Sequence, residues 1–329
     1  MKKILLIRFS SIGDIVLTTP VIRAVKQQLD CTLHVLTKKA FDTITGNNPH
    51  VDKVYAIHSS TKEVVEDLRN EQYDFIIDLQ KNARSIRLRR KLGVPSASFP
   101  KRNIEKWMLV NLKVNRLPHM HVVDRYFMAA VPLGVRNDRK GLEYYIPDDD
   151  RVDPGKIDPQ LTEGYAGIVI GGKHNTKILP VEKVIGIADA LGKPVLLLGG
   201  KQDQQAGEEI VEKSKNQRVF NACGKFNLNQ SASLVQQARV IITNDTGLMH
   251  IAAAFDKPVI TIWGNTVPAF GMYPYMPQSE NHYISSEVQG LRCRPCSKLG
   301  YSKCPKGHFK CMMQQDVGFI VEHALRFLR

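Results

Sequence analysis

Short apolar runs alternate with longer amphipathic stretches along most of the chain. In the first half, runs typical of buried parallel strands occupy residues 3–8, 32–37, 53–57 and 75–79. Apolar residues recur at helical spacing over residues 15–29 and 62–70. Strands that alternate with helices in this way predict βαβ units and a parallel sheet, which makes the fold class α/β.

A second alternating series begins near residue 166. It predicts strands at residues 166–170, 194–198, 218–222, 240–243 and 258–263, the last of which is expected to close the sheet. It predicts helices at residues 181–191, 204–215, 230–237 and 316–328. Between the two series, from about residue 95 to 160, Pro, Gly and charged residues accumulate, as is typical of a linker or surface segment.

The chain length fits two domains better than one core. A chain of 329 residues exceeds the size at which single cores usually stop growing. We therefore expect domains at residues 1–160 and 161–315, followed by a C-terminal helix at 316–329 that could pack back on the N-terminal domain. Two open α/β sheets in tandem leave a cleft between them, which is a common place for a ligand site.

The composition is that of a soluble globular protein, with 43% hydrophobic and 24% charged residues. The first apolar run is only four residues long before Arg8 interrupts it, so it indicates a strand rather than a signal peptide. No apolar stretch approaches the roughly 20 residues of a membrane span. We expect a cytoplasmic protein.

The net charge of +14 is concentrated in one region of the chain. Residues 81–140 contain 15 Lys and Arg against 3 Asp and Glu, a net charge of +12. Nucleic acid, an anionic membrane surface or an acidic substrate could each be the partner of such a region. A solvated basic face without a partner is the remaining alternative.

Residues 240–255 combine a predicted buried strand, a polar turn and a helix. Asn244, Asp245 and Thr246 are turn and cap residues, and Gly247 allows a close approach of the backbone. In open α/β sheets, ligands bind in the loops at the carboxyl ends of strands, and a helix that starts there directs N–H groups at a phosphate. A capped helix without a ligand is the alternative. Lys177 follows another strand of the same predicted sheet, so it could converge on the same phosphate site.

The loop at residues 10–14 follows the first strand and ends in Asp14. This carboxylate could cap the next helix, or act as a general base on a substrate hydroxyl. The chain contains neither the G-x-G-x-x-G nor the P-loop pattern, and no H-E-x-x-H. Dehydrogenase, P-loop and zinc-protease interpretations therefore lose their main support.

Four of the six cysteines lie within 19 residues, at Cys293, Cys296, Cys304 and Cys311. The C-x2-C-x7-C-x6-C spacing could form a structural zinc site of four thiolates. Free thiols are the other interpretation, and structural disulfides are less expected in a reducing cytoplasm. Neither arrangement would be catalytic.

Four segments in this order resemble glycosyltransferase family 9, the ADP-heptose:lipopolysaccharide heptosyltransferases and their relatives. They are residues 8–20 (RFSSIGDIVLTTP), 171–180 (GGKHNTKILP), 244–250 (NDTGLMH) and 263–266 (WGNT). The resemblance extends from residue 1 to about 320. It implies a GT-B architecture, in which two Rossmann-like domains with parallel sheets face each other across a cleft. It also implies an acceptor site on the N-terminal half, a nucleotide-sugar site on the C-terminal half, inversion of the anomeric centre, and no metal requirement.

The resemblance also implies residue roles. Asp14 resembles the family's catalytic base, and Lys177, with Thr176 beside it, resembles the basic residue that contacts the donor phosphates. The turn formed by Asp245, Thr246 and Gly247 resembles the family's turn that binds the diphosphate and the sugar. His250 follows this turn at the family's spacing. Residues expected to bind the acceptor are Ser10, Ser11, Gly13, Arg84 and Arg87.

Two segments depart from the family pattern, and both flank the donor site. Residues 264–268 read GNTVP where GPTDP is more frequent, and residues 178–180 read ILP where RWP is frequent. These differences put the identity of the donor sugar in doubt more than the chemistry.

The expected function is inverting, metal-independent transfer of heptose from ADP-heptose to an anionic, lipid-linked lipopolysaccharide core acceptor. No cofactor is expected. We expect a monomer in the cytoplasm, in peripheral contact with the inner face of the cytoplasmic membrane. The alternatives are a family member that uses another nucleotide-sugar, and a nucleotide-sugar epimerase on the same fold. A nucleic-acid-binding module would explain the charge but not the Asp14 and Asp245–His250 loops, so no nucleic-acid partner is expected.

Overall fold

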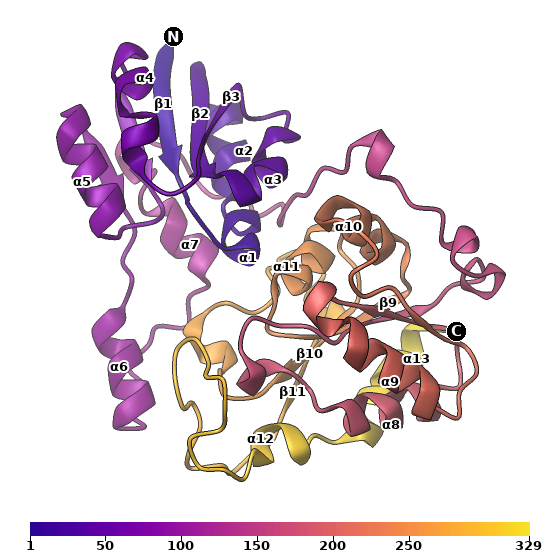
Figure 1. Ribbon diagram of the computed structural model, residues 1–329. Coiled ribbons are helices and arrows are strands. Elements are labelled where there is room, and N and C mark those ends of the chain that lie inside the picture. The colour runs from indigo at the N-terminus through magenta and orange to yellow at the C-terminus, as the bar shows by residue number, and fades with distance from the viewer. The chain divides into compact units, whose positions relative to one another are not determined.

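The computed structural model describes all residues, 1–329, and divides them into two compact units (Figure 1). Unit 1 comprises Met1–Lys101 and Met120–Tyr145, and unit 2 comprises Arg102–His119 and Ile146–Arg329. The expected boundary at residue 160 differs from this division, in which Arg102–His119 and everything from Ile146 onward belong to the second unit. None of the helices combines the length and the apolar character that crossing a membrane requires.

Unit 1 is built on a five-stranded parallel sheet with the strand order β3-β2-β1-β4-β5. Its strands are β1 (Lys2–Ile7), β2 (Cys31–Lys38), β3 (Lys53–Ile57), β4 (Phe75–Asp78) and β5 (Ser96–Ser98). Residues 4–7 of the central strand β1 are fully buried, as expected of a strand covered on both faces. β1 pairs with β2 and β4, and Ile7 lies opposite Leu36 and Asp78. The carboxyl ends of these three strands therefore meet at one edge of the sheet.

Helices cover both faces of this sheet (Figure 1). On one face, α4 (Val65–Asn70) and α5 (Ala83–Leu92) pack on Leu5, Ile7 and Ile76. On the other lie α2 (Thr19–Gln28) and α3 (Asp42–Gly46), and α7 (Val122–Phe127) packs against α2.

The single helix predicted for residues 15–29 is wrong, because the chain forms two helices there. α1 (Ile12–Val16) ends at Leu17, and α2 begins at Thr19. Pro20 stands in the first turn of α2. Proline has no N–H to continue the hydrogen bonding of a preceding helix, but it fits the first turn of a new one.

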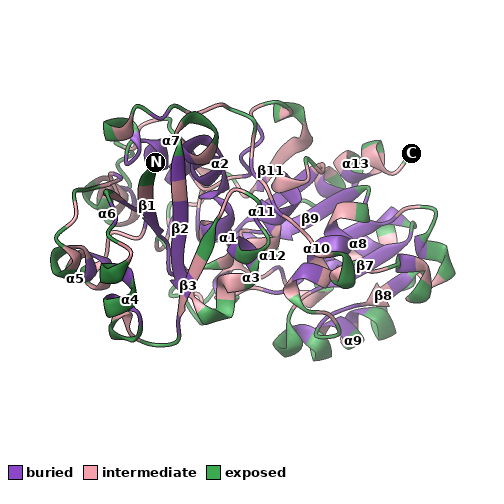
Figure 2. Cartoon of the chain, turned by 90° about the horizontal axis from the view of Figure 1, so that it is seen from above, coloured by how far each residue is buried: buried purple, intermediate pink, exposed green.

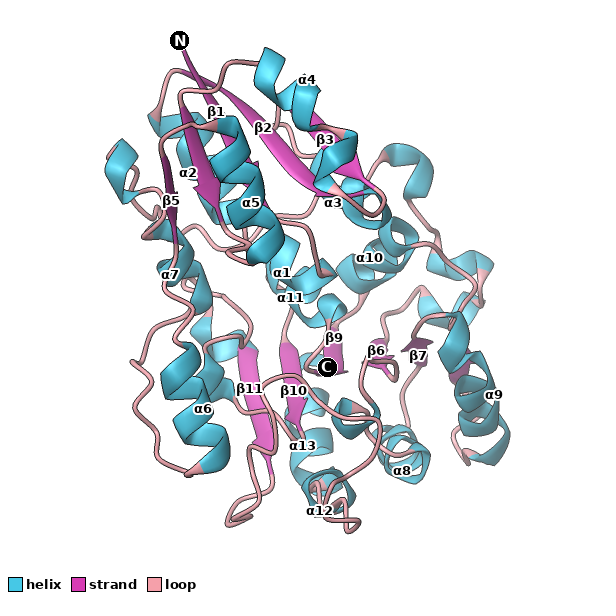
Figure 3. Cartoon of the chain, turned by 60° about the vertical axis from the view of Figure 1, so that its left-hand side comes forward, coloured by secondary structure: helices cyan, strands magenta, loops and turns pink.

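Unit 2 contains a six-stranded parallel sheet with the strand order β11-β10-β9-β6-β7-β8. Its strands are β6 (Ala166–Val169), β7 (Val195–Leu198), β8 (Val219–Asn221), β9 (Val240–Asn244), β10 (Val259–Trp263) and β11 (Tyr283–Glu287). The prediction that residues 258–263 close the sheet is wrong, since β11 pairs outside β10 (Figure 3). β11 reads Tyr-Ile-Ser-Ser-Glu and lies at the edge, so it lacks the apolar run that marks a buried strand.

The helices of unit 2 are α6 (Asn103–Asn111), α8 (Val181–Leu191), α9 (Gln204–Lys213), α10 (Leu228–Gln237), α11 (Gly247–Ala254), α12 (Lys310–Met313) and α13 (Val317–Phe327). The C-terminal helix α13 packs on α8 and on strands β9, β10 and β11 within unit 2. The four inner strands of this sheet, β10, β9, β6 and β7, are buried throughout, whereas the edge strands β11 and β8 are buried only in part. The outer faces of the helices are exposed (Figure 2).

Candidate active site

Asp14 lies in the first turn of α1, directly beyond the carboxyl end of β1. Its Oδ2 accepts hydrogen bonds from Ser11 N at 3.1 Å and from Ser11 Oγ at 2.9 Å, which makes it the acidic half of a capping box. Its Oδ1 lies 2.7 Å from Arg8 Nη2, and 23% of its side chain is exposed. A carboxylate that is fixed by these contacts and still open to solvent can both cap a helix and meet a substrate hydroxyl.

Arg8 is the residue that fixes the position of Asp14. It is 7% exposed, and its Nη1 donates to the carbonyl of Leu79 at 2.5 Å and to Tyr126 Oη at 2.9 Å. Burial opposes the charge of this guanidinium, but the nearby Asp14, Tyr126 and Asp78 outweigh burial and raise the pKa of Arg8 above its ordinary value. The guanidinium therefore stays charged beside Asp14.

The other residues expected to bind the acceptor lie at the same edge of the unit 1 sheet. Ser10 is half-buried, Ser11 is the exposed N-cap of α1, and Gly13 is buried within α1. Arg84, in the first turn of α5, places its guanidinium carbon 5.7 Å from the ring centroid of Phe9. Arg87 is exposed and donates to the carbonyl of Ala83 in its own helix.

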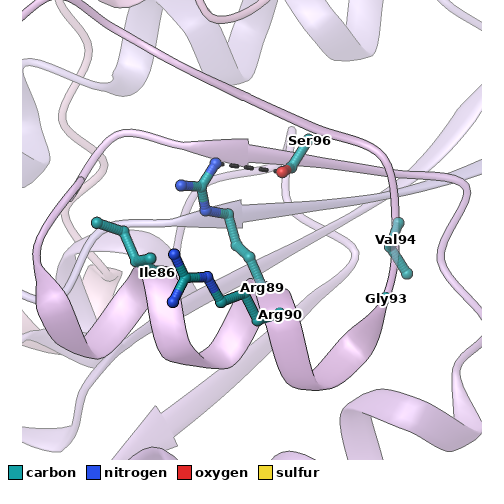
Figure 4. Close-up of a pocket in the computed structure, with 6 residues that line it drawn as sticks. All are labelled: Ile86, Arg89, Arg90, Gly93, Val94 and Ser96. Carbon is teal, nitrogen blue, oxygen red and sulfur yellow. Dashed lines mark hydrogen bonds between the residues drawn. The ribbon is translucent and has the colours of Figure 1, made fainter.

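A hollow of about 360 Å³ lies at the other end of α5, lined by Ile86, Arg89, Arg90, Gly93, Val94 and Ser96 (Figure 4). Arg89 turns into it and donates from Nη1 to Ser96 Oγ at 3.1 Å. Ser96 begins β5, whereas Asp14 follows the end of β1. None of the residues expected to bind the acceptor lines this hollow, so it is not part of the predicted acceptor site.

In unit 2, the loops that follow the neighbouring strands β6 and β9 meet at Lys177 and Asp245. Lys177 Nζ lies 2.6 Å from Asp245 Oδ2, and the two side chains are 16% and 15% exposed. Thr266, in the loop after β10, donates from Oγ1 to the same carboxylate oxygen at 2.9 Å. Three loops at the carboxyl edge of one sheet thus converge on one polar cluster.

Thr176 positions the loop that carries Lys177. It is 2% exposed, and its Oγ1 donates to Asn265 Oδ1 at 3.2 Å and accepts from Tyr301 N at 2.8 Å. Gly264 packs so closely that a Cβ there would lie 2.7 Å from the Thr176 carbonyl oxygen and 2.6 Å from Met312 Cε. Thr176 therefore has a supporting place in the site, behind the more accessible Lys177.

The turn after β9 leads into α11 with Thr246 as N-cap and Gly247 as the first helical residue. Thr246 forms no side-chain cap bond to α11, and its Oγ1 lies 3.3 Å from Thr243 Oγ1 instead. The first N–H groups of α11 are thus not occupied by the cap side chain and can receive an anion. His250 lies one turn further along and is only 2% exposed, so its side chain contributes to the packing of α11.

The cysteine-rich segment forms no metal-holding cluster. No three His, Cys, Asp or Glu side chains of the chain are arranged to hold a metal ion. Cys293 Sγ lies 3.8 Å from His308 Nε2, Cys296 Sγ donates to the carbonyl of Cys293 at 3.1 Å, and Cys311 is buried. All six cysteines are free thiols, and the zinc site stays a prediction from the spacing.

Three residues that complete these sites have no role predicted from the sequence. Arg8 pairs with Asp14, Thr266 bonds Asp245, and Arg294 donates to the carbonyls of Gly264 and Thr266. Arg8 and Thr266 belong to the quoted motifs 8–20 and 263–266, so their presence near the sites could be read from the sequence. Their partners lie 6 and 21 positions away, and only the folded loops show the contacts.

Known proteins are similar to this chain over most of its length. The profile of glycosyltransferase family 9 (heptosyltransferase) matches residues 62–301. The chain is 26% identical over 288 residues to lipopolysaccharide heptosyltransferase 1 of Campylobacter coli, covering 80% of this chain and 84% of that protein. It is 25% identical over 292 residues to lipooligosaccharide heptosyltransferase 2 of Haemophilus influenzae, covering 81% and 84%.

Solved structures show the fold. A glycosyltransferase of family 9 from Veillonella parvula superposes with a TM-score of 0.79 at 21% identity, covering 99% of this chain and 97% of that one. The ADP-heptose lipopolysaccharide heptosyltransferase II of E. coli gives a TM-score of 0.71 at 20% identity, covering 100% and 98%. These likenesses, with the two parallel sheets, confirm the α/β class and the GT-B fold. Since the family profile spans more than half of the sequence, the chain belongs to glycosyltransferase family 9 (heptosyltransferase) and is a glycosyltransferase.

Proposed function

We propose that this enzyme transfers heptose from ADP-heptose to a lipopolysaccharide core acceptor, with inversion of the anomeric carbon and without a metal ion. Relatives that align with about four-fifths of the chain are named lipopolysaccharide and lipooligosaccharide heptosyltransferases. A structure with the same fold is named for ADP-heptose. The departures at residues 178–180 and 264–268 keep another nucleotide-sugar as the alternative donor.

The observation that carries the proposal is the ion pair between Lys177 Nζ and Asp245 Oδ2, next to the N-terminus of α11. A lysine ammonium has three donors, so it can hold Asp245 and a phosphate oxygen together. The leaving diphosphate gains negative charge as the glycosidic bond breaks. Lys177 and the first N–H groups of α11 would stabilise that charge, since donors held in place before the reaction need no reorganisation as the charge develops.

Asp14 is the proposed general base. It takes the proton of the acceptor hydroxyl while the hydroxyl oxygen forms a bond to C1 of the heptose. The bond between C1 and the diphosphate oxygen breaks, and its electron pair leaves with ADP. Attack from the face opposite to the diphosphate inverts C1, and the transition state has oxocarbenium character, as glycosidic bond chemistry generally has.

The proposed acceptor is anionic, and the enzyme would meet it as a monomer at the inner face of the cytoplasmic membrane. The net charge of +12 over residues 81–140 supports this part of the proposal. Phosphorylated saccharide cores and the lipid surface that presents them attract Lys and Arg through the same electrostatic field.

The test of Asp14 is Asp14→Asn, assayed with ADP-heptose and a heptose-free core acceptor. We expect turnover to fall about 10²–10⁴-fold, while ADP affinity stays close to that of the wild type. The control is Asp67→Asn, which alters an exposed carboxylate in α4 of the same unit. Near-normal turnover by Asp14→Asn would contradict its role as base. A product with the same anomeric configuration as the donor, determined by NMR, would contradict inversion.

Metal independence has its own test. Dialysis against a chelator should leave the transfer rate unchanged within error, because the proposed charge stabilisation comes from Lys177 and backbone N–H groups. Metal content measured before dialysis tests the zinc prediction for Cys293, Cys296, Cys304 and Cys311 separately. Release of a rearranged sugar without any acceptor would favour the epimerase alternative.

A further inference from the structure

Helix α6 exposes an apolar stripe. Ile104 is 74% exposed and Trp107 is 56% exposed, and residues three apart lie on the same face of a helix. Leu109 is 8% exposed and anchors the other face. Directly after the helix, Leu112 and Val114 are also exposed, at 54% and 40%. Large apolar side chains gathered in one exposed segment are unusual for a surface that meets only water.

The cysteine-rich segment 288–315 is basic and contains no Asp or Glu. It carries exposed apolar side chains as well, with Leu299 at 60% and Tyr301 at 43%. Arg294 is the basic residue of this segment that pairs with a carboxylate, that of Glu287. The exposed basic residues of the segment are Arg292, Lys298, Lys303, Lys306 and Lys310.

These two segments are neighbours within unit 2. Lys113 Nζ, just beyond α6, donates to the carbonyl of Pro295 at 2.7 Å and to that of Cys293 at 3.2 Å. Figures 1 and 3 both show α6 beside the chain that follows β11. We name the adjoining parts of these two segments, residues 103–116 and 291–310, the α6–Cys surface.

We propose that the α6–Cys surface docks unit 2 on an anionic lipid bilayer. Exposed Ile, Leu and Trp side chains enter the boundary between headgroups and acyl chains, where Trp is especially favourable. The surrounding Lys and Arg face the negative headgroups, which attract them. The inference rests on the proposed function, since a lipid-linked acceptor is presented at such a surface.

The combination of side chains favours a bilayer over a nucleic acid. Phosphate contacts need basic residues but give no reason for exposed aliphatic side chains. A single apolar stripe with little positive charge would bind a bilayer weakly, whereas both together supply two independent attractions. The absence of acidic residues over 288–315 leaves the charge of this segment available for the headgroups.

Tryptophan fluorescence of the full chain tests the proposal directly. The chain has two tryptophans, and Trp263 is 1% exposed whereas Trp107 is 56% exposed. Vesicles with 30% phosphatidylglycerol should shift the emission to shorter wavelength, and brominated lipid should quench it. Trp107→Phe should abolish both signals, and pure phosphatidylcholine vesicles should produce much weaker ones.

Vesicle flotation with matched variants tests the charges. Lys298→Glu, Lys303→Glu and Lys306→Glu together should weaken binding at least about a hundredfold, since each basic residue near the surface contributes roughly fivefold. The control carries the same charge change at the exposed Lys156, Lys193 and Lys215 of the same unit. Ile104→Ser with Trp107→Ser should also weaken binding, without changing transfer to a soluble, lipid-free acceptor.

The proposal is overturned if Trp107 emission is unchanged by anionic vesicles, or if both triple variants bind equally. Binding to duplex DNA that matches vesicle binding in affinity and salt dependence would also overturn it. The two proposals fail separately. Loss of heptosyl transfer with intact vesicle binding contradicts the proposed function alone, whereas full transfer to soluble acceptor without vesicle binding contradicts only the docking surface.

Discussion

Asp14 and Lys177 are each held by a charge of opposite sign, and this pairing shapes what they can do. Arg8 lies 2.7 Å from Asp14, and Asp245 lies 2.6 Å from Lys177. Both pairs keep part of their surface open, so each side chain is positioned and still accessible. Both pairs are mostly buried, and the cost of desolvating two buried charges offsets much of their mutual attraction. Preorganisation for a substrate is therefore a better explanation of their geometry than a gain in stability.

Replacement of Lys177 by Ala should weaken ADP binding about 10–100-fold, the usual effect of losing a hydrogen bond to a charged group. Adenosine has no phosphate, so its affinity should change far less. Calorimetric titration of the two ligands measures the difference. Lys173→Ala is the matched control, because this exposed lysine lies in the same loop. An equal loss of affinity for ADP and for adenosine would contradict a contact between Lys177 and a phosphate.

At the scale of elements, the donor-site loops depend on close packing between backbone segments. The loop after β6 and the loop after β10 touch where Gly264 meets the Thr176 carbonyl, with Met312 on the other side. The sequence predicted the strands that carry these loops, because buried parallel strands show continuous apolar runs. It did not predict the contact, which depends on two loops 88 positions apart in residue number.

Gly264→Ala should destabilise unit 2 by about 1–3 kcal/mol, since the added methyl meets backbone rather than a flexible side chain. It should also weaken ADP binding, because Thr176 adjoins Lys177. Thermal unfolding and ADP titration measure the two effects. Gly186→Ala in α8 is the control, since its Cβ would meet only Val317 at 4.0 Å. If Gly264→Ala changed neither the melting temperature nor the ADP affinity, the close contact between the two loops would not be needed for stability or binding.

At the scale of the molecule, buried protonated groups set the alkaline limit of stability. Burial raises the pKa of Cys223 and of Tyr283 to about 12, and that of Cys311 to about 11. These groups stay protonated in the folded chain at a pH where the unfolded chain has lost the protons. Their contribution to stability is therefore complete below about pH 8.5 and is lost as the pH rises toward 11–12.

We expect the melting temperature to be level from about pH 6 to 8.5 and to fall progressively above that. Between pH 7.5 and 10.5, the melting temperature of Cys223→Ala should fall less than that of the wild type. This difference is expected whatever the stability of the variant at pH 7.5. Scanning calorimetry at matched ionic strength measures the melting temperatures of the wild type and the variant. A melting temperature that does not change up to pH 10.5 would contradict the role of these groups.

The sequence alone determined the class of fold, the two tandem sheets, and the loops that carry Asp14, Lys177 and Asp245. These follow from local patterns, because apolar runs, turn residues and helix caps act over a few neighbouring positions. The tertiary structure decided what local patterns cannot encode. It placed edge strand β11 and helix α6 in unit 2, split residues 15–29 into two helices, and supplied Arg8 and Thr266 as partners of the predicted residues. Each of these depends on which distant segments pack together, a choice made by the burial of the whole chain.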